Sequence, residues 1–303
     1  MSKRPVLIFV GSGWGAPDTR AGHGPLVLAE KLQPFLDSEK IPYYCLNFHK
    51  NEPYAIYKKI PKTQLDLHRH KVTQTVENLC DLIVQVMKEG FFPIVIGGDH
   101  SIAIGTWSGV RLSNPQRLFG LMWLDAHMDA HTFESTSTGA PHGMPVGALM
   151  GHGYKPWVSL GNLVPKIYPE NLAQIAIRSF EVGEAHMLKE NNVRIYYENQ
   201  VVHHGFDHVY AEAKEHITRN TPYFGISIDI DAFDPVFAPG TGTREPKGLN
   251  PNHVLPHLQG LLYDPNCLAL EIAEFNALKD DPDQKTLTLV SNLVLAVLEK
   301  KYT

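Results

Sequence analysis

The chain has 303 residues, with 27 Lys and Arg against 32 Asp and Glu, so its formal charge is −5 at pH 7. A hydrophobic content of 43% with 19% charged residues is typical of a folded protein and excludes wholesale disorder. The mild acidity, without a compact Lys/Arg cluster, argues against a nucleic-acid partner. No apolar run approaches the roughly 18 residues needed to span a bilayer, so we expect no membrane segment.

The cysteine content and the N-terminal segment indicate the cellular compartment in which the protein is expected. The first apolar run stops at Val10, which is short for the hydrophobic region of a signal peptide. Cys45, Cys80 and Cys267 are far apart and form no CxxC motif. This pattern fits a reducing environment, so we expect a cytoplasmic protein without a disulfide or zinc-finger scaffold.

Eight short apolar runs are predicted to be β-strands. They are continuous rather than alternating, which is typical of strands that are buried on both faces. In chain order they are Pro5–Val10, Tyr43–Asn47, Phe92–Ile96, Leu118–Leu124, Gln174–Ile177, Val193–Tyr197, Phe224–Ile230 and Cys267–Ile272.

Helical patterns lie between several of these runs. The clearest extends from about Leu65 to Lys88, where apolar residues recur at helical spacing and Gly90 can end the helix. Another, Thr286–Lys300, follows the helix-stopping Pro282. Strands alternating with helices predict a mostly parallel sheet covered on both faces. No change in composition divides the chain, so we expect one α/β domain over residues 1–303.

Three of the predicted strands end in motifs rich in Asp and His. GGDHS follows Ile96, DAHMD follows Leu124, and DIDAFDP closes the strand Phe224–Ile230. Ligands of open parallel sheets bind outside the carboxyl ends of the strands, and alternate side chains of extended backbone point the same way. We therefore expect one cluster of four carboxylates and two imidazoles, formed by His100, Asp125, His127, Asp129, Asp229 and Asp231.

Such a cluster needs positive charge. Buried carboxylates without counter-charge repel one another and stay protonated, whereas two divalent cations would compensate them. A carboxylate-rich set without thiolates suits Mn²⁺ better than structural Zn²⁺. Two neighbouring cations share a water and lower its pKa, which predicts a hydrolase. Any one motif could equally cap a helix, but three at successive strand ends favour a metal site.

Other candidate motifs favour structural roles. The glycine-rich segment Gly11–Gly15 lacks the GxGxxG spacing of a dinucleotide loop, so we expect a turn. His68 and His70 are two residues apart on the long helix and do not face each other. His204 and His208 have the spacing of a helical metal pair, but we favour a solvent-facing helix surface.

At these motifs the chain resembles the ureohydrolase superfamily, which includes arginase, agmatinase and formimidoylglutamase, and it is most similar to the arginases. GGDHS, DAHMD and SIDIDAFDP match the three metal-binding signatures, and the resemblance covers most of the chain. It implies a three-layer α/β/α fold around a mostly parallel, eight-stranded sheet. It also implies two Mn²⁺ per subunit and a homo-oligomer, either a trimer or a hexamer.

The resemblance also implies a reaction in which a hydroxide between the metals attacks the guanidinium carbon and an amine and urea are released. Ligands of one Mn²⁺ would be His100, Asp125, Asp129 and Asp229, and those of the other His127, Asp125, Asp229 and Asp231, with Asp125 and Asp229 bridging. Glu274 would bind the guanidinium, or would be a structural acid at a helix start. His142 would shuttle a proton, or would be an exposed loop histidine, and Asp129 would also relay a proton.

L-Arginine is the substrate that the resemblance favours. The Ser- and Thr-rich segment from Asp129 to His142 has the length of the arginase loop. The expected substrate-binding residues are His131, Thr136, Thr138, Glu181 and Glu274. Asparagine is usual in arginases where this chain has His131 and Ala140, and aspartate is usual where it has Glu181. Agmatine or another guanidino acid or amine is therefore an alternative substrate, and a catalytically silent binding or regulatory subunit is an alternative of another class.

Overall fold

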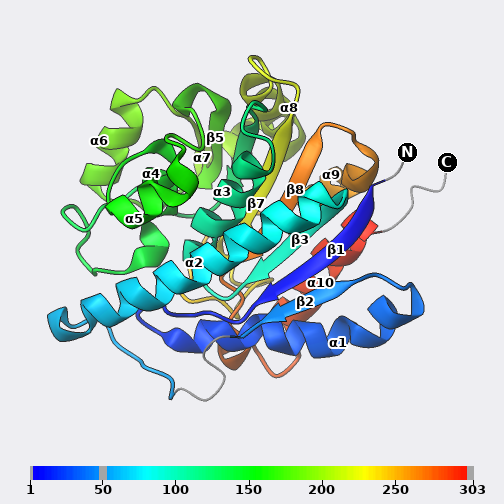
Figure 1. Cartoon of the computed structure of the whole chain (residues 1–303), viewed down its shortest axis with the longest axis horizontal. Coiled ribbons are helices and arrows are strands. Elements are labelled where there is room, and N and C mark those ends of the chain that lie inside the picture. Colours follow the sequence, from blue (N-terminus) through cyan, green and yellow to red (C-terminus); the bar gives the residue numbers. More distant parts are fainter. Residues whose placement is uncertain (1–2, 48–52, 299–303) are drawn as a thin grey trace.

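The computed structural model describes residues 3–47 and 53–298, and its strands form one sheet of eight (Figure 1). All of the strand pairings are parallel, and the order is β2-β1-β3-β8-β7-β4-β5-β6. The strands are β1 (Arg4–Val10), β2 (Tyr43–Leu46), β3 (Phe91–Gly97), β4 (Gly120–Leu124), β5 (Leu172–Ile177), β6 (Arg194–Tyr197), β7 (Phe224–Asp229) and β8 (Cys267–Ala273).

Helices cover both faces of this sheet, which gives the three-layer α/β/α architecture that the sequence predicted. One side carries α2 (Leu65–Lys88), α3 (Ala103–Ser113), α4 (Pro145–Met150) and α6 (Val182–Glu190). The other side carries α1 (Gly24–Ser38), α7 (Glu198–His204), α8 (Phe206–Ile217), α9 (Pro251–Leu258) and α10 (Lys285–Leu298). The short helix α5 (Lys155–Val158) packs in a smaller apolar cluster with α2 and α4.

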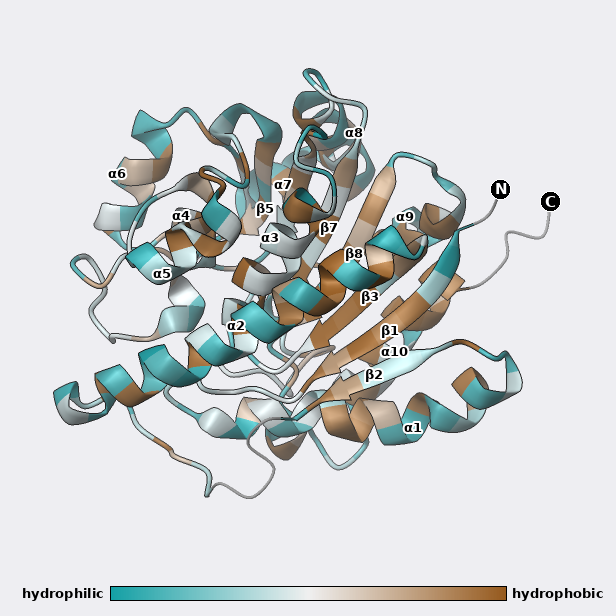
Figure 2. Ribbon diagram, in the orientation of Figure 1, coloured by the Kyte–Doolittle hydropathy of each residue, from teal (hydrophilic) through white to brown (hydrophobic). Residues whose placement is uncertain are grey.

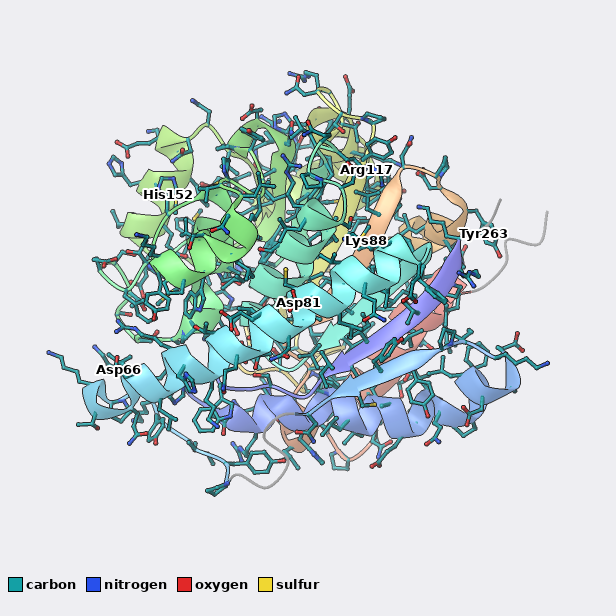
Figure 3. The ribbon with its side chains drawn as sticks, viewed as in Figure 1. Asp66, Asp81, Lys88, Arg117, His152 and Tyr263 are labelled. Atoms are coloured by element: carbon teal, nitrogen blue, oxygen red, sulfur yellow. The ribbon has the colours of Figure 1, made fainter. Side chains whose placement is uncertain are left out.

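Alternation along each strand builds the two cores. On β1, Leu7 and Phe9 face the layer of α1 and α10, while Val6, Ile8 and Val10 face the layer of α2 and α3. The apolar colour of the central strands in Figure 2 reflects burial on both faces. The long amphipathic α2 turns its charged side chains outward, as Asp66, Asp81 and Lys88 show in Figure 3.

The predicted elements are confirmed with small shifts. The helix Leu65–Lys88 has the predicted bounds, whereas the run from Leu118 becomes a strand only at Gly120. The predicted burial of β2 was wrong, because β2 is an edge strand whose Tyr44 and Cys45 are exposed. The last helix begins one residue early, at Lys285, and its predicted end at Lys300 lies outside the described residues.

The strand order places the chemistry-bearing strands side by side. The neighbours β3, β8, β7 and β4 occupy the middle of the sheet, and the segments after their carboxyl ends meet at one edge. Within residues 3–47 and 53–298, no helix combines the length and apolar character needed to cross a bilayer.

Candidate metal centre

Four central strands deliver the predicted metal-type side chains to one place. His100 follows β3, Asp125 follows β4, Asp229 ends β7, and Glu274 directly follows β8. Asp129 and Glu274 have φ values of 50° and 67°, in the left-handed region that non-glycine residues seldom adopt. Such backbone strain in buried residues is typical of a functional site.

The first group of donor atoms surrounds Nδ1 of His100. This nitrogen lies 3.1 Å from Oδ2 of Asp229 and 3.2 Å from Oδ2 of Asp129. Oδ2 of Asp125 is 3.3 Å away. One ligand atom from each of these four buried residues lies within 4.8 Å of the others, so the group could hold a metal ion.

The second group shares Asp125 with the first. Nδ1 of His127 lies 3.0 Å from Oδ2 of Asp231 and 3.6 Å from Oδ1 of Asp125, and these three residues form the second possible metal group. Asp229, which the family resemblance implies as a ligand of both ions, belongs only to the first group here. Its Oδ1 accepts a hydrogen bond from the backbone N–H of Asp231 at 2.8 Å.

The electrostatics of the cluster fit a pair of cations. Burial, with the charges of Asp231 and Asp125, raises the pKa of Asp229 well above its usual range. Burial and the charge of Asp125 raise the pKa of Asp129 to about 7. Burial alone would lower the pKa of His100, but the surrounding carboxylates raise it well above its usual range. Four carboxylates that repel one another are stabilised by nearby positive charge. Together with two imidazoles and no thiolate, they form a donor set for divalent metal ions.

Buried residues that the sequence analysis missed hold His100 in place. Its Nε2 lies 2.9 Å from Oγ of Ser227, which in turn donates to Oε1 of Glu271 at 2.8 Å. The indole of Trp123 stacks on the His100 ring with centroids 4.1 Å apart and donates from Nε1 to Asp125 at 2.9 Å. The sequence feature that could have revealed this group is Glu271, a single acidic residue within an otherwise apolar strand.

Glu274 and His142, both predicted catalytic residues, are brought together beside this cluster. Nδ1 of His142 lies 2.8 Å from Oε1 of Glu274, which also accepts the backbone N–H of His100 at 3.0 Å. Burial alone would lower the pKa of His142, but the charge of Glu274 and this hydrogen bond raise it to about 9. His142 is therefore protonated at neutral pH in this arrangement.

The loop that carries His142 is fastened to the GGDHS segment. The His142 N–H donates to the carbonyl of Gly15 at 3.0 Å, and the Gly15 N–H donates to Asp99 Oδ2 at 2.9 Å. A Cβ at position 15 would overlap the Asp99 carboxylate. The predicted turn Gly11–Gly15 thus has a positioning role that its spacing did not indicate.

A cavity of about 300 Å³ opens over the cluster, and most of the predicted substrate-binding residues line it. Among them are His131, Thr138 and Glu181. Thr136 is not among the lining residues, and its Oγ1 accepts the backbone N–H groups of Thr138 and Gly139 within the loop.

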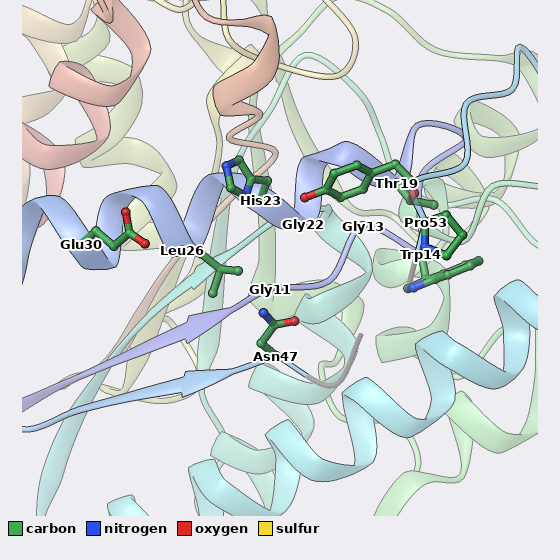
Figure 4. Close-up of a pocket in the computed structure, with 11 residues that line it drawn as sticks. Gly11, Gly13, Trp14, Thr19, Gly22, His23, Leu26, Glu30, Asn47 and Pro53 are labelled. Atoms are coloured by element: carbon green, nitrogen blue, oxygen red, sulfur yellow. The ribbon is translucent and has the colours of Figure 1, made fainter. Parts of the chain in front are cut away.

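A second cavity, of about 320 Å³, lies beside the glycine-rich first loop, between residues such as Gly13, Leu26 and Pro53 (Figure 4). None of the predicted site residues lines it. Among the described residues, His68, His204 and His208 belong to neither possible metal group. His68 is buried with its Nδ1 2.6 Å from the carbonyl of Trp14, and His204 and His208 belong to two different helices, α7 and α8.

Comparisons with known proteins agree with this site. The model of the arginase family matches residues 19–299. The chain belongs to the arginase family. Over 201 residues it is 37% identical to a protein named arginase from Bacillus caldovelox, and the alignment covers 66% of this chain but only 62% of that relative. It is 35% identical to the arginase of Bacillus subtilis strain 168 over 227 residues, 74% of this chain and 75% of that protein.

Solved structures of arginases share the whole architecture of this arginase-family chain. The crystal structure of arginase from Bacillus subtilis superposes with a TM-score of 0.84 at 29% identity. That superposition covers 99% of this chain and all of the other. The predicted family and fold class are therefore confirmed.

Proposed function

We propose that this protein is a two-metal amidinohydrolase that converts L-arginine and water to L-ornithine and urea. The observation that supports this most is that the carboxylate–imidazole cluster and the Glu274–His142 pair face one cavity. A guanidinium is a weak electrophile, so its hydrolysis needs a strong nucleophile and a carboxylate to orient it. The names of the relatives support arginine as the substrate.

We propose Mn²⁺ as the metal, with two ions per subunit. Hard carboxylate oxygens with two imidazoles suit this ion. The first ion would be held by His100, Asp125, Asp129 and Asp229, and the second by His127, Asp125 and Asp231, which are the two possible metal groups of the structure. On the family resemblance alone, we propose that Asp229 also holds the second ion. When bound, two divalent cations lower the pKa of a shared water and so supply hydroxide at neutral pH.

The side chains then have distinct roles. Glu274 holds the guanidinium with its carbon facing the nucleophile. The new C–O bond forms at that carbon, and the bond from the same carbon to the side-chain nitrogen breaks. The leaving nitrogen needs a proton, which His142 can supply because its pKa of about 9 keeps it charged at neutral pH. Asp129, which lines the same cavity, can relay the proton released by the attacking water.

Further expectations belong to this proposal. We propose that His131, Thr138 and Glu181 bind the amino-acid end of the substrate, and that Thr136, which lies outside the cavity lining, supports Thr138 through its hydrogen bond to the Thr138 N–H. We also propose one domain over residues 1–303, because all described strands join one sheet, and a cytoplasmic homo-oligomer, a trimer or hexamer. A guanidino amine such as agmatine is a second candidate substrate. The observation that favours it is that both ring nitrogens of His131 already face other side chains, Ser135 and Glu184.

The test is urea release by the manganese-loaded protein with L-arginine, agmatine, 4-guanidinobutyrate and guanidine at equal concentrations. We expect urea from L-arginine and none from the Asp125→Asn and Asp229→Asn variants. Full activity in either variant would contradict the mechanism. A protein that binds no stoichiometric metal and hydrolyses none of the four would instead be a silent member of the family.

A further inference from the structure

Each of the two metal-type imidazoles has a second ring nitrogen that points away from its metal group. For His100 this nitrogen, Nε2, is connected to Glu271 through the hydroxyl of Ser227. For His127 the corresponding Nε2 faces Oε1 of Glu245 directly, at 3.7 Å. Both imidazoles therefore have a glutamate behind them, but the one behind His127 comes from the loop between β7 and α9 rather than from a strand.

The group around His127 has the weaker set of donors in this structure. It contains two carboxylates, Asp125 and Asp231, whereas the group around His100 contains three. The side chain of His127 is also 25% exposed, against 1% for His100. Fewer charged ligands and more solvent weaken the binding of a cation. A further carboxylate beside His127 therefore matters more to this group than to the other.

Glu245 is held in place through both its backbone and its side chain. Its carbonyl accepts a hydrogen bond from Nη2 of Arg178 at 2.9 Å, and the same nitrogen donates to the carbonyl of Asp231 at 2.6 Å. The guanidinium thus ties the loop of Glu245 to a residue of the second metal group. Oε1 of Glu245 also accepts a hydrogen bond from Ser179 Oγ at 3.1 Å. These contacts fix the carboxylate beside His127, where it is 27% exposed.

The position of this carboxylate determines what it does to the ring. A distance of 3.7 Å between Nε2 of His127 and Oε1 of Glu245 is that of an ion pair rather than of a hydrogen bond. The negative charge favours a proton on Nε2, which leaves Nδ1 to bind a metal ion. Nδ1 is the nitrogen that lies toward Asp231 and Asp125. A carboxylate behind a metal-binding imidazole orients the ring and makes the opposite nitrogen a stronger ligand.

We propose that Glu245 is a positioning residue for the second metal ion and acts through His127. Its carboxylate keeps Nδ1 of the ring turned toward the metal group and adds negative charge where the group has fewer carboxylates. The first ion does not depend on it, because the His100 ring is held by Ser227 and Glu271 instead. This inference rests on the proposed function, because it assumes that two ions bind at the cluster.

The test measures how tightly each manganese ion binds to the full chain and to its Glu245→Gln variant, which loses the charge but keeps the length of the side chain. Metal-free protein is titrated with Mn²⁺, and the free ion is measured by electron paramagnetic resonance. The variant His127→Asn identifies the binding constant of the second ion. We expect Glu245→Gln to weaken this ion about tenfold, since Glu245 is partly exposed. The first ion should change less than about threefold, as is usual for a partly exposed charge without a direct partner.

A double variant distinguishes an effect through His127 from direct binding of the ion by Glu245. The asparagine of His127→Asn keeps an oxygen that can bind Mn²⁺, but it has no ring to orient. If Glu245 acts through the imidazole, then adding Glu245→Gln to His127→Asn costs no further affinity for the second ion. A further loss as large as that of Glu245→Gln alone would mean that Glu245 acts independently of His127, and it would overturn the inference.

Glu181→Gln is the matched control for metal binding. Glu181 lines the same cavity and accepts a hydrogen bond from a serine, Ser137 Oγ, at 2.7 Å. The imidazole that it faces, at 3.9 Å, is that of His131, which belongs to neither metal group. Both manganese binding constants of this variant should stay within about threefold of wild type. A loss at the second ion as large as in Glu245→Gln would show that any negative charge in the cavity suffices, which would overturn the role of Glu245.

The metal-binding constants separate this inference from the proposed function. If Glu245→Gln binds both ions as tightly as wild type, or loses both equally, the inference is wrong and the proposed function stands. If the wild-type protein binds two ions but releases no urea, the proposed reaction is wrong, and the binding constants of the variants still decide the role of Glu245. A wild-type protein that binds fewer than two ions would overturn both.

Discussion

Oε1 of Glu274 lies 2.8 Å from Nδ1 of His142, so the residue proposed to orient the guanidinium is paired with the residue proposed to protonate the leaving amine. Both side chains are largely withdrawn from water. The charge of Glu274 raises the pKa of His142, against the effect of burial, and His142 lowers the pKa of Glu274 in the same way. In the proposed reaction, an incoming guanidinium takes the place of the imidazolium beside Glu274, which frees His142 to give up its proton.

This pair predicts a pH-dependent stability of the metal-free protein. The raised pKa of His142 stabilises the fold fully below pH 6.5, its ordinary value, and this contribution is lost as the pH rises through about 9. The shift from 6.5 to about 9 is about 2.5 units, or on the order of 3 kcal/mol. The lowered pKa of Glu274 adds stability that is lost only under acid conditions. Glu274→Gln should therefore cost most near pH 6 and little above pH 9.

Denaturant unfolding of wild type and variant at pH 6 and pH 9.5 would measure this difference. His186 and Glu190 form a similar pair, with Nε2 and Oε1 3.1 Å apart, but both side chains are about two-thirds exposed. Glu190→Gln should change stability little at either pH, because solvent screens the pair. An equal loss of stability at both pH values in Glu274→Gln would contradict the prediction.

Metal binding should release protons and strengthen with pH. Without metal, His100 and His127 hold protons because neighbouring carboxylates outweigh the effect of burial, and the pKa of Asp129 is about 7. Cations compete with these protons, so the apparent affinity for Mn²⁺ should rise roughly tenfold per pH unit for each proton displaced between pH 6 and pH 8. Chelator competition and proton release into a weak indicator buffer would measure both quantities. An affinity that is the same at pH 6 and pH 8 would be incompatible with this cluster.

The hydrogen-bonded chain from His100 through Ser227 to Glu271 should control the first metal group. Ser227 accepts from Nε2 of His100, which leaves Nδ1 free for a metal ion. Ser227→Ala and Glu271→Gln should each weaken Mn²⁺ binding at this group by about 10- to 100-fold and leave the second ion bound. Ser291→Ala, a buried serine that bonds within α10, is the matched control. Equal loss of both ions would show that the hydrogen bonds from Ser227 and Glu271 do not act through His100.

The parts of this molecule that the sequence predicted are those with a local signal. A continuous apolar run marks a buried strand, and Asp or His directly after it must lie at the sheet edge, so the six donor residues could be named without coordinates. Ser227 and Glu245 carry no such signal. Ser227 is one polar residue within an apolar strand, and Glu245 belongs to a loop whose course depends on the folded chain. The exposure of β2 also depended on strand order, which a run of apolar residues does not encode.

Gly15 provides the last prediction, because its backbone joins Asp99 to His142 through hydrogen bonds of 2.9 and 3.0 Å. A Cβ there would overlap the Asp99 carboxylate, so Gly15→Ala must displace that carboxylate or the first loop, and either shift breaks the link from Asp99 to His142. We expect a loss of about 1–3 kcal/mol in the free energy of unfolding, as is usual for overpacking, and at least a tenfold fall in kcat. Gly183→Ala is the matched control, since its Cβ would meet only Ser135 at an ordinary 3.4 Å. If Gly15→Ala matched Gly183→Ala in both stability and kcat, then Asp99 and Gly15 would not hold His142 in place.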